Sequence, residues 1–249
     1  MTATATKTEE SSIKDLCDMT DPCVIRQNPV TNNHLYIKLK RPPSINGFRG
    51  KGDGKTSTLD LLQVLVLDKF VDCVKNGEDP KVTMIFVQSF EDQNVIKNFL
   101  ISNLKTHLQG KVTPWICNNS AVGKITKIEN DRKVKNGDIK LYITTSVMMC
   151  GVDLPRVDLI IITRPFSHIS SIIQAGGRGG RILRDGNRRR VIVYLLYNAS
   201  DIRSNSTRVT EPVRRLYSSS TCIKSQLHAY FSTDGEEYDE NPSWCCNFH

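Results

Sequence analysis

The sequence predicts an α/β fold in which a parallel, doubly wound sheet is flanked by helices. Short β-branched runs alternate with segments of helical periodicity along most of the chain, and this alternation is typical of parallel sheets. The 249 residues are 39% hydrophobic, which is enough to bury a core in one or two domains. No apolar run approaches the ~20 residues that a membrane-spanning helix needs.

Hydrophobic periodicity and chain breakers set the expected elements. The run His34–Lys40 alternates like a strand until Pro42 and Pro43 stop it, and the apolar spacing from Leu59 to Val74 predicts a helix. The expected strands are short and rich in β-branched or aromatic residues: His34–Lys40, Val82–Gln88, Thr113–Cys117, Ile139–Thr145, Val157–Arg164 and Arg190–Leu196. The expected helices are Ser12–Asp18, Thr58–Asn76, Glu91–Leu104 and Ile125–Lys135.

The chain is basic, and the excess is local. It has 34 Lys+Arg against 26 Asp+Glu, a formal net charge of +8. Such a cluster suits a phosphate backbone, although a merely solvated basic surface remains the alternative. The clustered arginines are Arg178, Arg181, Arg184, Arg188, Arg189, Arg190, Arg203, Arg208, Arg214 and Arg215.

The amino terminus and the cysteines favour a reducing compartment. Met1–Thr6 lacks the basic and apolar regions of a signal peptide, so we expect the nucleus or the cytoplasm. In such compartments cysteines are mostly thiols, with metal sites as the main exception. Five of the eight cysteines are isolated in sequence and are expected to be core or surface residues: Cys17, Cys23, Cys73, Cys117 and Cys150.

The segment Gln174–Arg181 (QAGGRGGR) carries the strongest chemical signal. Glycines let a backbone approach a ligand closely, and arginine donates paired hydrogen bonds to phosphate with a charge that does not titrate. Ligands of parallel sheets bind at the carboxyl ends of strands, and the loops Ser146–Pro155 and Arg164–Arg181 both begin at such ends. The segment predicts a phosphate site.

A second glycine-rich segment, Gly52–Thr56, is a decoy. It resembles the end of a phosphate-binding P-loop, but the full pattern needs a glycine where this chain has Arg49. The residues before it form a diproline loop rather than a strand, so backbone N–H groups are not expected to point at phosphates. A basic linker explains it better.

Together with Gln174–Arg181, several motifs resemble the second motor lobe of RecQ-family DNA helicases, within superfamily 2, along almost the whole chain. Met1–Thr6 (MTATAT) is similar to the Thr-Ala-Thr-Ala motif that closes the family's first lobe. Met84–Ser89, Tyr142–Ser146 and Gly151–Pro155 resemble the motifs that follow, in the family's order. The implied fold is a RecA-like lobe.

The resemblance implies an ATP-dependent DNA helicase that moves 3′ to 5′. Arg178 and Arg181 match arginines that stabilise charge on the transferring γ-phosphoryl group. The residues expected near the nucleotide are Gln174, Gly177, Gly151 and Asp153. Those expected on the nucleic-acid backbone are Ser89, Thr145 and Ser146, with the basic run Arg188, Arg189 and Arg190 as a further candidate.

The tail adds a candidate metal site. Cys222–Phe231 resembles the opening of the family's zinc-binding subdomain, whose first ligand cysteine lies on a helix. Cys245, Cys246 and His249 are available to complete a Zn²⁺ site, and the Cys246–His249 spacing is ligand-like. The family's later Cys-x-x-Cys steps are absent, so spare thiols in a loose tail are the alternative.

Three segments are expected: residues 1–24 as a remnant of lobe one and a linker, 25–200 as the RecA-like lobe, and 201–249 as a partial zinc-binding tail. The P-loop and the acidic magnesium box of the family belong to lobe one, and this chain starts at the motif that closes that lobe. We therefore expect ATP and Mg²⁺ to be bound only with a missing first lobe present, and no ATP hydrolysis by the chain alone.

Two other functions stay open at this point. The chain could be a non-enzymatic nucleic-acid-binding module that holds its ligand through the arginine-rich stretch, or an inactive helicase remnant. DNA, single-stranded or forked, is the expected partner. RNA also stays open, because such motifs contact the backbone rather than the base edges.

Overall fold

A computed structural model describes residues 5–20, 22, 28–41, 58–108, 115–118, 120–136, 138–146, 157–180, 189–232 and 244–247. Within them the strands form one six-stranded sheet in the order β1-β6-β5-β2-β4-β3, and every neighbouring pair is parallel. The strands are β1 (His34–Lys40), β2 (Val82–Phe86), β3 (Trp115–Asn118), β4 (Leu141–Thr144), β5 (Val157–Ile162) and β6 (Val191–Tyr197). The predicted parallel α/β fold is confirmed.

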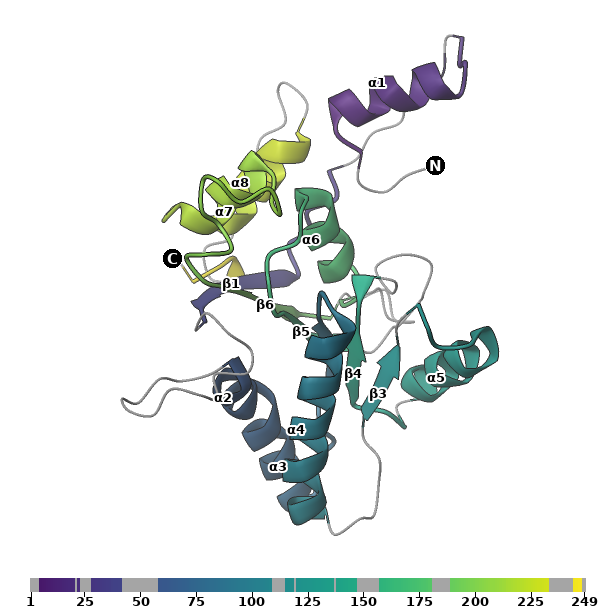
Figure 1. Cartoon of the computed structure of the whole chain (residues 1–249), viewed down its shortest axis with the longest axis vertical. Coiled ribbons are helices and arrows are strands. Elements are labelled where there is room, and N and C mark those ends of the chain that lie inside the picture. The colour runs from purple at the N-terminus through teal and green to yellow at the C-terminus, as the bar shows by residue number, and fades with distance from the viewer. Residues whose placement is uncertain are drawn as a thin grey trace.

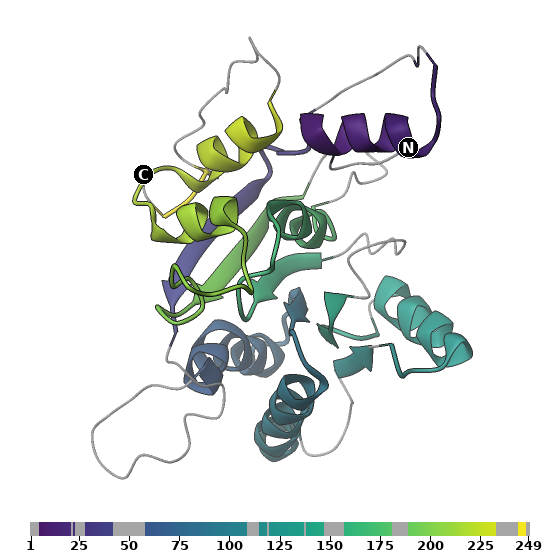
Figure 2. The same ribbon diagram turned by 45° about the horizontal axis from the view of Figure 1, so that its top comes forward.

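Helices cover both faces of the sheet (Figure 1, Figure 2). One face carries α2 (Thr58–Leu62), η1 (Gln63–Leu67), α3 (Asp68–Lys75) and α4 (Phe90–Leu108). The other face carries α6 (Ile169–Gly176), α7 (Glu211–Ser218) and α8 (Ile223–Phe231). Beside β3 lies α5 (Lys124–Asn136), and α1 (Lys7–Leu16) lies apart from the sheet in both views.

Strand alternation builds two cores, one on each face. Along β2, Met84 and Phe86 point into the core under α6, α7 and α8, whereas Ile85 and Val87 point into the core under α3 and α4. Successive side chains of a strand face opposite ways, so a strand covered on both sides has to be apolar throughout. All five residues of β2 are buried.

The edge strand β1 anchors distant segments through buried polar side chains. Arg41 directly follows β1; its side chain is 0% exposed and makes paired bonds of 3.0 and 2.7 Å to the Asp201 carboxylate. Lys38 Nζ donates 2.9 Å to the carbonyl oxygen of Leu216 and also to that of Ser219, at the end of α7. These contacts tie the start of the sheet to the segment after β6.

Most expected elements are present, with informative differences. The expected helix over 58–76 is interrupted by the π-helical turn η1. The first helix starts earlier than expected, at Lys7, because Thr6 and Glu9 form a capping box. Helix α7 was not expected from the sequence, although Thr210 before Pro212 and apolar residues at 213, 216 and 217 carry its signal.

The tail belongs to the same core as the sheet. Val213, Leu216, Ile223 and Leu227 lie in one hydrophobic cluster with the strands. The proposed division at residue 201 stays a prediction. Among the described residues, no helix has both the length and the apolarity to cross a membrane.

The Arg41–Asp201 pair gives a stability prediction. Arg41→Ala leaves the Asp201 carboxylate, whose side chain is 11% exposed, without its cation, and we expect a loss of roughly 3–5 kcal/mol in the free energy of unfolding. Lys140→Ala is the matched control, because its partner Asp79 is 78% exposed and a surface pair contributes about 1 kcal/mol or less. Urea denaturation measures both, and equal losses would contradict the anchoring role of Arg41.

Candidate functional site

The arginine motif, defined as Gln174–Arg181, lies at the amino end of the sheet. Helix α6 begins after the carboxyl end of β5 and runs back along the sheet, so its last residues reach the opposite end. There the Gly180 amide donates 3.4 Å to the carbonyl of Val157, the first residue of β5. The expectation that the loop begins at a carboxyl end holds, but Arg178 itself lies at the other end.

Close packing explains the glycines around Arg178. A Cβ on Gly179 would lie 2.9 Å from Val191 Cγ1 and 3.0 Å from the Val157 carbonyl. Gly180 has φ +64°, and a Cβ there would lie 2.2 Å from Asn33 Nδ2. The glycines therefore let this loop approach the starts of neighbouring strands, whereas the sequence suggested a ligand as the reason.

The start of β1 holds the motif on both sides of Arg178. Asn33 Nδ2 donates 2.8 Å to the Gly180 carbonyl and 2.7 Å to the Arg189 carbonyl. His34 Nε2 lies 3.0 Å from the Gly176 carbonyl, and because a carbonyl only accepts, this nitrogen carries the hydrogen. Sequence analysis did not single out Asn33 or His34, since neither belongs to a motif of its own.

The arginines near the motif differ in how they are engaged. Arg178 is partly exposed, and its Nε donates 3.4 Å to the Gln174 carbonyl, one turn back on α6. Arg189 pairs with Asp158 at 3.0 Å, and Arg190 lies 4.9 Å over the ring of Trp244. Arg181 and Arg188 lie outside the described residues, as do Gly151 and Asp153.

The predicted backbone contacts lie together at the carboxyl end of the sheet. Ser89 follows β2 and caps α4, because its Oγ accepts 3.0 Å from the Asp92 amide. Thr145 and Ser146 follow the neighbouring strand β4, Thr145 nearly buried and Ser146 exposed. Arg164, after β5, pairs loosely with Asp92 at 3.5 Å. An exposed Ser146 beside a helix amino terminus suits an anionic backbone.

The structure therefore divides the expected site into two groups. Ser89, Thr145 and Ser146 lie at one end of the sheet, and Gln174, Gly177 and Arg178 lie toward the other, with Arg189 and Arg190 beside them. The two groups are joined by β5 and α6, a continuous strand and helix with buried apolar residues. A single small ligand cannot touch both groups.

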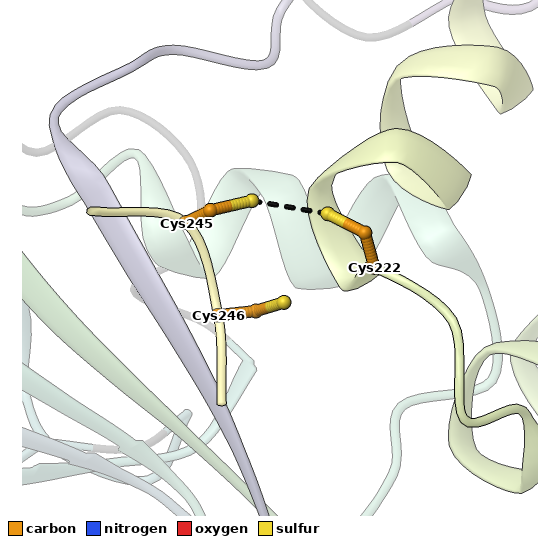
Figure 3. Close-up of side chains that lie close together, drawn as sticks. All are labelled: Cys222, Cys245 and Cys246. Atoms are coloured by element: carbon orange, nitrogen blue, oxygen red, sulfur yellow. Dashed lines mark hydrogen bonds between the residues drawn. The ribbon is translucent and has the colours of Figure 1, made fainter. Parts of the chain in front are cut away.

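A cluster of three cysteines forms where the tail meets α8 (Figure 3). Cys222 is the amino-terminal cap of α8, and Cys245 and Cys246 lie on the tail. Their Sγ atoms lie within 4.8 Å of one another, all three residues are buried, and Cys222 Sγ is 3.0 Å from Cys245 Sγ. His249, the expected fourth ligand, lies outside the described residues.

Burial and two lysines set the electrostatics of the cluster. Burial, with the hydrogen bond to Cys245, raises the pKa of the Cys222 thiol to about 12. Burial lowers the pKa of Lys38 to about 8 and also lowers the pKa of Lys224, while charge on the cysteines opposes both shifts. The Cys222 thiol therefore keeps its proton at neutral pH, and a metal would have to displace that proton.

The tail closes the open edge of the sheet at β1. The Tyr36 amide donates 3.0 Å to the Cys245 carbonyl, and Tyr36 and Cys246 form a parallel bridge. Asn247 Oδ1 accepts 3.1 Å from the Lys38 amide, and its Nδ2 donates 3.1 Å to the Lys38 carbonyl. This pairing satisfies backbone groups that an edge strand would otherwise expose.

The cysteine cluster fits a Zn²⁺ ion. Zinc takes thiolates at about 2.3 Å in a tetrahedron, and three sulfurs this close can converge on one ion with a small movement of the Cys222–Cys245 pair.

Residues in the middle of the chain match a known protein family. Residues 63–183, just under half of the chain, match the family described as "Helicase conserved C-terminal domain". This part of the chain is therefore similar to the C-terminal domain of helicases. The match contains β2 to α6 and the whole arginine motif. It leaves β1, α7, α8 and the cysteine cluster outside.

The curated relatives are larger helicases. The chain is 24% identical over 173 residues to the ATP-dependent helicase Lhr-Core of Sulfolobus acidocaldarius, covering 64% of this chain and 18% of the relative. It is 22% identical over 146 residues to Lhr-Core of Methanothermobacter thermautotrophicus, covering 54% and 16%. The chain spans 9–21% of the length of the curated relatives it matches.

Solved helicase structures share the fold. S. cerevisiae Dbp5 bound to RNA and ADP BeF3 superposes with a TM-score of 0.56 at 16% identity, covering 92% of this chain and 48% of that one. Mycobacterium smegmatis Lhr bound to ssDNA and AMP-PNP gives 0.50 at 17% identity, covering 68% and 20%. The predicted RecA-like α/β fold is confirmed. These relatives are of the Lhr and Dbp5 kinds, so the narrower RecQ assignment is not confirmed.

The left-handed backbone at Gly180 gives a stability prediction for the sheet and the loop that packs on it. Gly180→Ala combines an unfavourable φ with a clash against Asn33, whereas Gly77→Ala has φ +71° and nothing within 4 Å of the added Cβ. We expect Gly77→Ala to lose about 1–2 kcal/mol and Gly180→Ala clearly more. Thermal or urea unfolding measures both, and a Gly180→Ala loss no greater than the Gly77→Ala loss would contradict the close packing of this loop.

Proposed function

We propose that this chain is the second motor lobe of an ATP-dependent helicase that acts together with a first lobe. The observation that carries the proposal is the division of its polar groups between the two ends of one rigid sheet. Arg178 lies at the amino end, and Ser89 and Ser146 lie at the carboxyl end. A motor needs such separate places for nucleotide and nucleic acid in one body.

Arg178, at the amino end of the sheet, would complete together with Arg181 a nucleotide site that the first lobe supplies. Their guanidinium groups would donate to the transferring phosphoryl group and offset its negative charge, a contribution of about 10³–10⁵ in rate in related phosphoryl-transfer enzymes. Gln174 and Gly177 lie on the same stretch, and Gly151 and Asp153 are expected beside the nucleotide. ATP with Mg²⁺ supplies the free energy when it is bound.

At the carboxyl end, Ser89, Thr145 and Ser146 would hold a strand by its phosphates. Serine and threonine hydroxyls with backbone amides read the backbone and not the bases, so binding would tolerate sequence and weaken with salt. DNA is the proposed substrate, and RNA is the alternative outcome. Opening and closing of the lobe-one cleft would move this edge one step along the strand.

Within the helicases, a RecQ-like motor with 3′ to 5′ polarity is the narrower proposal. Two observations outside the matched domain support it: the Met1–Thr6 sequence, and the meeting of Cys222 with Cys245 and Cys246 at the position expected for a zinc subdomain. Because zinc holds thiolates firmly, it would fasten the tail to α8. A nuclear or cytoplasmic location stays the expectation.

The arginine-finger role predicts a selective loss of activity. In the protein that joins this chain to its first lobe, Arg178→Ala and Arg181→Ala should each lower kcat for ATP by about 10³-fold or more, with affinity for single-stranded DNA nearly unchanged. Arg132→Ala, an exposed arginine on α5, is the matched control and should keep full activity. ATP hydrolysis that survives both arginine changes would show that the arginine-finger role is wrong.

The cysteine cluster predicts one zinc ion per chain. Purified chain should contain about one equivalent by elemental analysis, and Cys222→Ser should reduce it to a small fraction. Cys73→Ser, which changes an isolated free thiol, should leave the zinc content unchanged. Less than half an equivalent in the unaltered chain, or equal losses in the two variants, would argue for a cluster of ordinary buried thiols.

A further inference from the structure

Two adjacent side chains at the start of β1, outside the matched domain, form hydrogen bonds with the backbone of the arginine motif. His34 binds the Gly176 carbonyl, and Asn33 binds the Gly180 carbonyl, so the backbone is held on both sides of Arg178. Asn33 also binds the Arg189 carbonyl. One amide therefore links Gly180, in the arginine motif, to Arg189, just before β6.

We propose that Asn33 is a positioning residue for the arginine motif, holding the backbone at Gly180 so that Arg178 meets the phosphates at the right place. The inference rests on the proposed function, because it assigns Asn33 no role except through the arginine. Asn33 lies outside residues 63–183, so the residue that holds the motif is not part of the matched domain. The hydrogen bonds from Asn33 to Gly180 and Arg189 are called the clamp below.

The hydrogen bonds of Asn33 make the clamp specific for an amide. Both hydrogens of Nδ2 are used on carbonyl oxygens, and Oδ1 accepts 2.6 Å from Thr31 Oγ1. Thr31 Oγ1 also lies 2.6 Å from His34 Nδ1, which joins the two gripping side chains. An aspartate of the same shape would place an oxygen against two carbonyl oxygens, because a carboxylate has no N–H to donate.

Gly180 leaves the space that the Asn33 side chain occupies. A Cβ on Gly180 would lie 2.2 Å from Asn33 Nδ2, so only glycine fits at residue 180 beside the Asn33 side chain. On the other side, the Asn33 carbonyl accepts 2.9 Å from the Val191 amide and 3.2 Å from Trp244 Nε1. Trp244 immediately precedes Cys245, so the tail that carries the cysteine cluster also supports the clamp.

Placement matters for such arginines because their effect depends on short, directed hydrogen bonds. A reacting or stabilising group displaced by about 1 Å can lose about 10²-fold in rate. Asn33→Asp should therefore lower kcat for ATP by about 10–100-fold and leave KM for ATP within about threefold. A residue with only a general structural role would instead lower the amount of active protein without this kcat signature.

The test is a double-mutant cycle in the protein that carries this chain with its first lobe. Asn33→Asp is measured alone and in the Arg178→Ala, Arg181→Ala background, where no further loss of kcat is expected because coupled residues are not additive. Asn103→Asp is the matched control, since that amide donates a single 2.8 Å bond to Phe99 within α4. It should leave kcat unchanged.

A second measurement uses the 249-residue chain itself. Hydrogen exchange should quicken at least tenfold at residues 178–180 and at Val191 in Asn33→Asp, and stay unchanged in α4. If Asn33→Asp unfolds the chain, Asn33→Ala, which removes the donors without adding charge, takes its place in both measurements.

The outcomes separate the clamp from the proposed function. Full ATP hydrolysis in the arginine variants overturns the function itself. If the arginine variants lose kcat for ATP but the Asn33 variants stay within about threefold of the unaltered kcat, the clamp alone is overturned. The clamp is also overturned if Asn33→Asp lowers kcat by the same factor in the arginine-variant background as it does alone. Asn33 would then act independently of the arginines.

Discussion

The pairing of β1 with β6 is the constraint on which the rest of this structure depends. The two strands pair over seven residues at the edge of the sheet, and β1 is the first strand in sequence but lies beside the last. Through it, polar side chains reach segments far along the chain: Asn33 the arginine motif, Lys38 the end of α7, and Arg41 the turn at Asp201. Because these groups are largely buried, each contact has to be satisfied for the edge to hold.

This edge joins three features that the sequence keeps apart. The arginine motif, the cysteine cluster and the α7–α8 pair all meet β1 or its immediate flanks. The carboxyl end of the sheet is built differently, from loops after β2, β4 and β5 in the middle of the sheet. A substitution at the β1 edge should therefore disturb the residues of the proposed nucleotide site more than those of the proposed nucleic-acid site.

Local patterns predicted the sheet well because a strand buried on both faces has little freedom in composition, as β2 and β5 show. The resemblance to a zinc-binding subdomain, and not a local pattern, grouped Cys222 with Cys245 and Cys246. The clamp could not be predicted, because Asn33 and Gly180 lie far apart in the sequence and come together only through the order of the strands in the sheet. Likewise, the run Arg188–Arg190 looked uniformly available, whereas Asp158 and Trp244 engage Arg189 and Arg190.

The central claim is that one lobe presents arginines to a nucleotide at the amino end of its sheet and a backbone-binding edge at the carboxyl end. The most direct measurement is a structure of the two-lobe protein with ADP, beryllium fluoride, Mg²⁺ and single-stranded DNA. We expect Arg178 and Arg181 within hydrogen-bonding distance of the phosphate mimic and Ser89, Thr145 and Ser146 along the DNA phosphates. Arginines remote from the nucleotide, or DNA lying along the amino end of the sheet, would contradict the account.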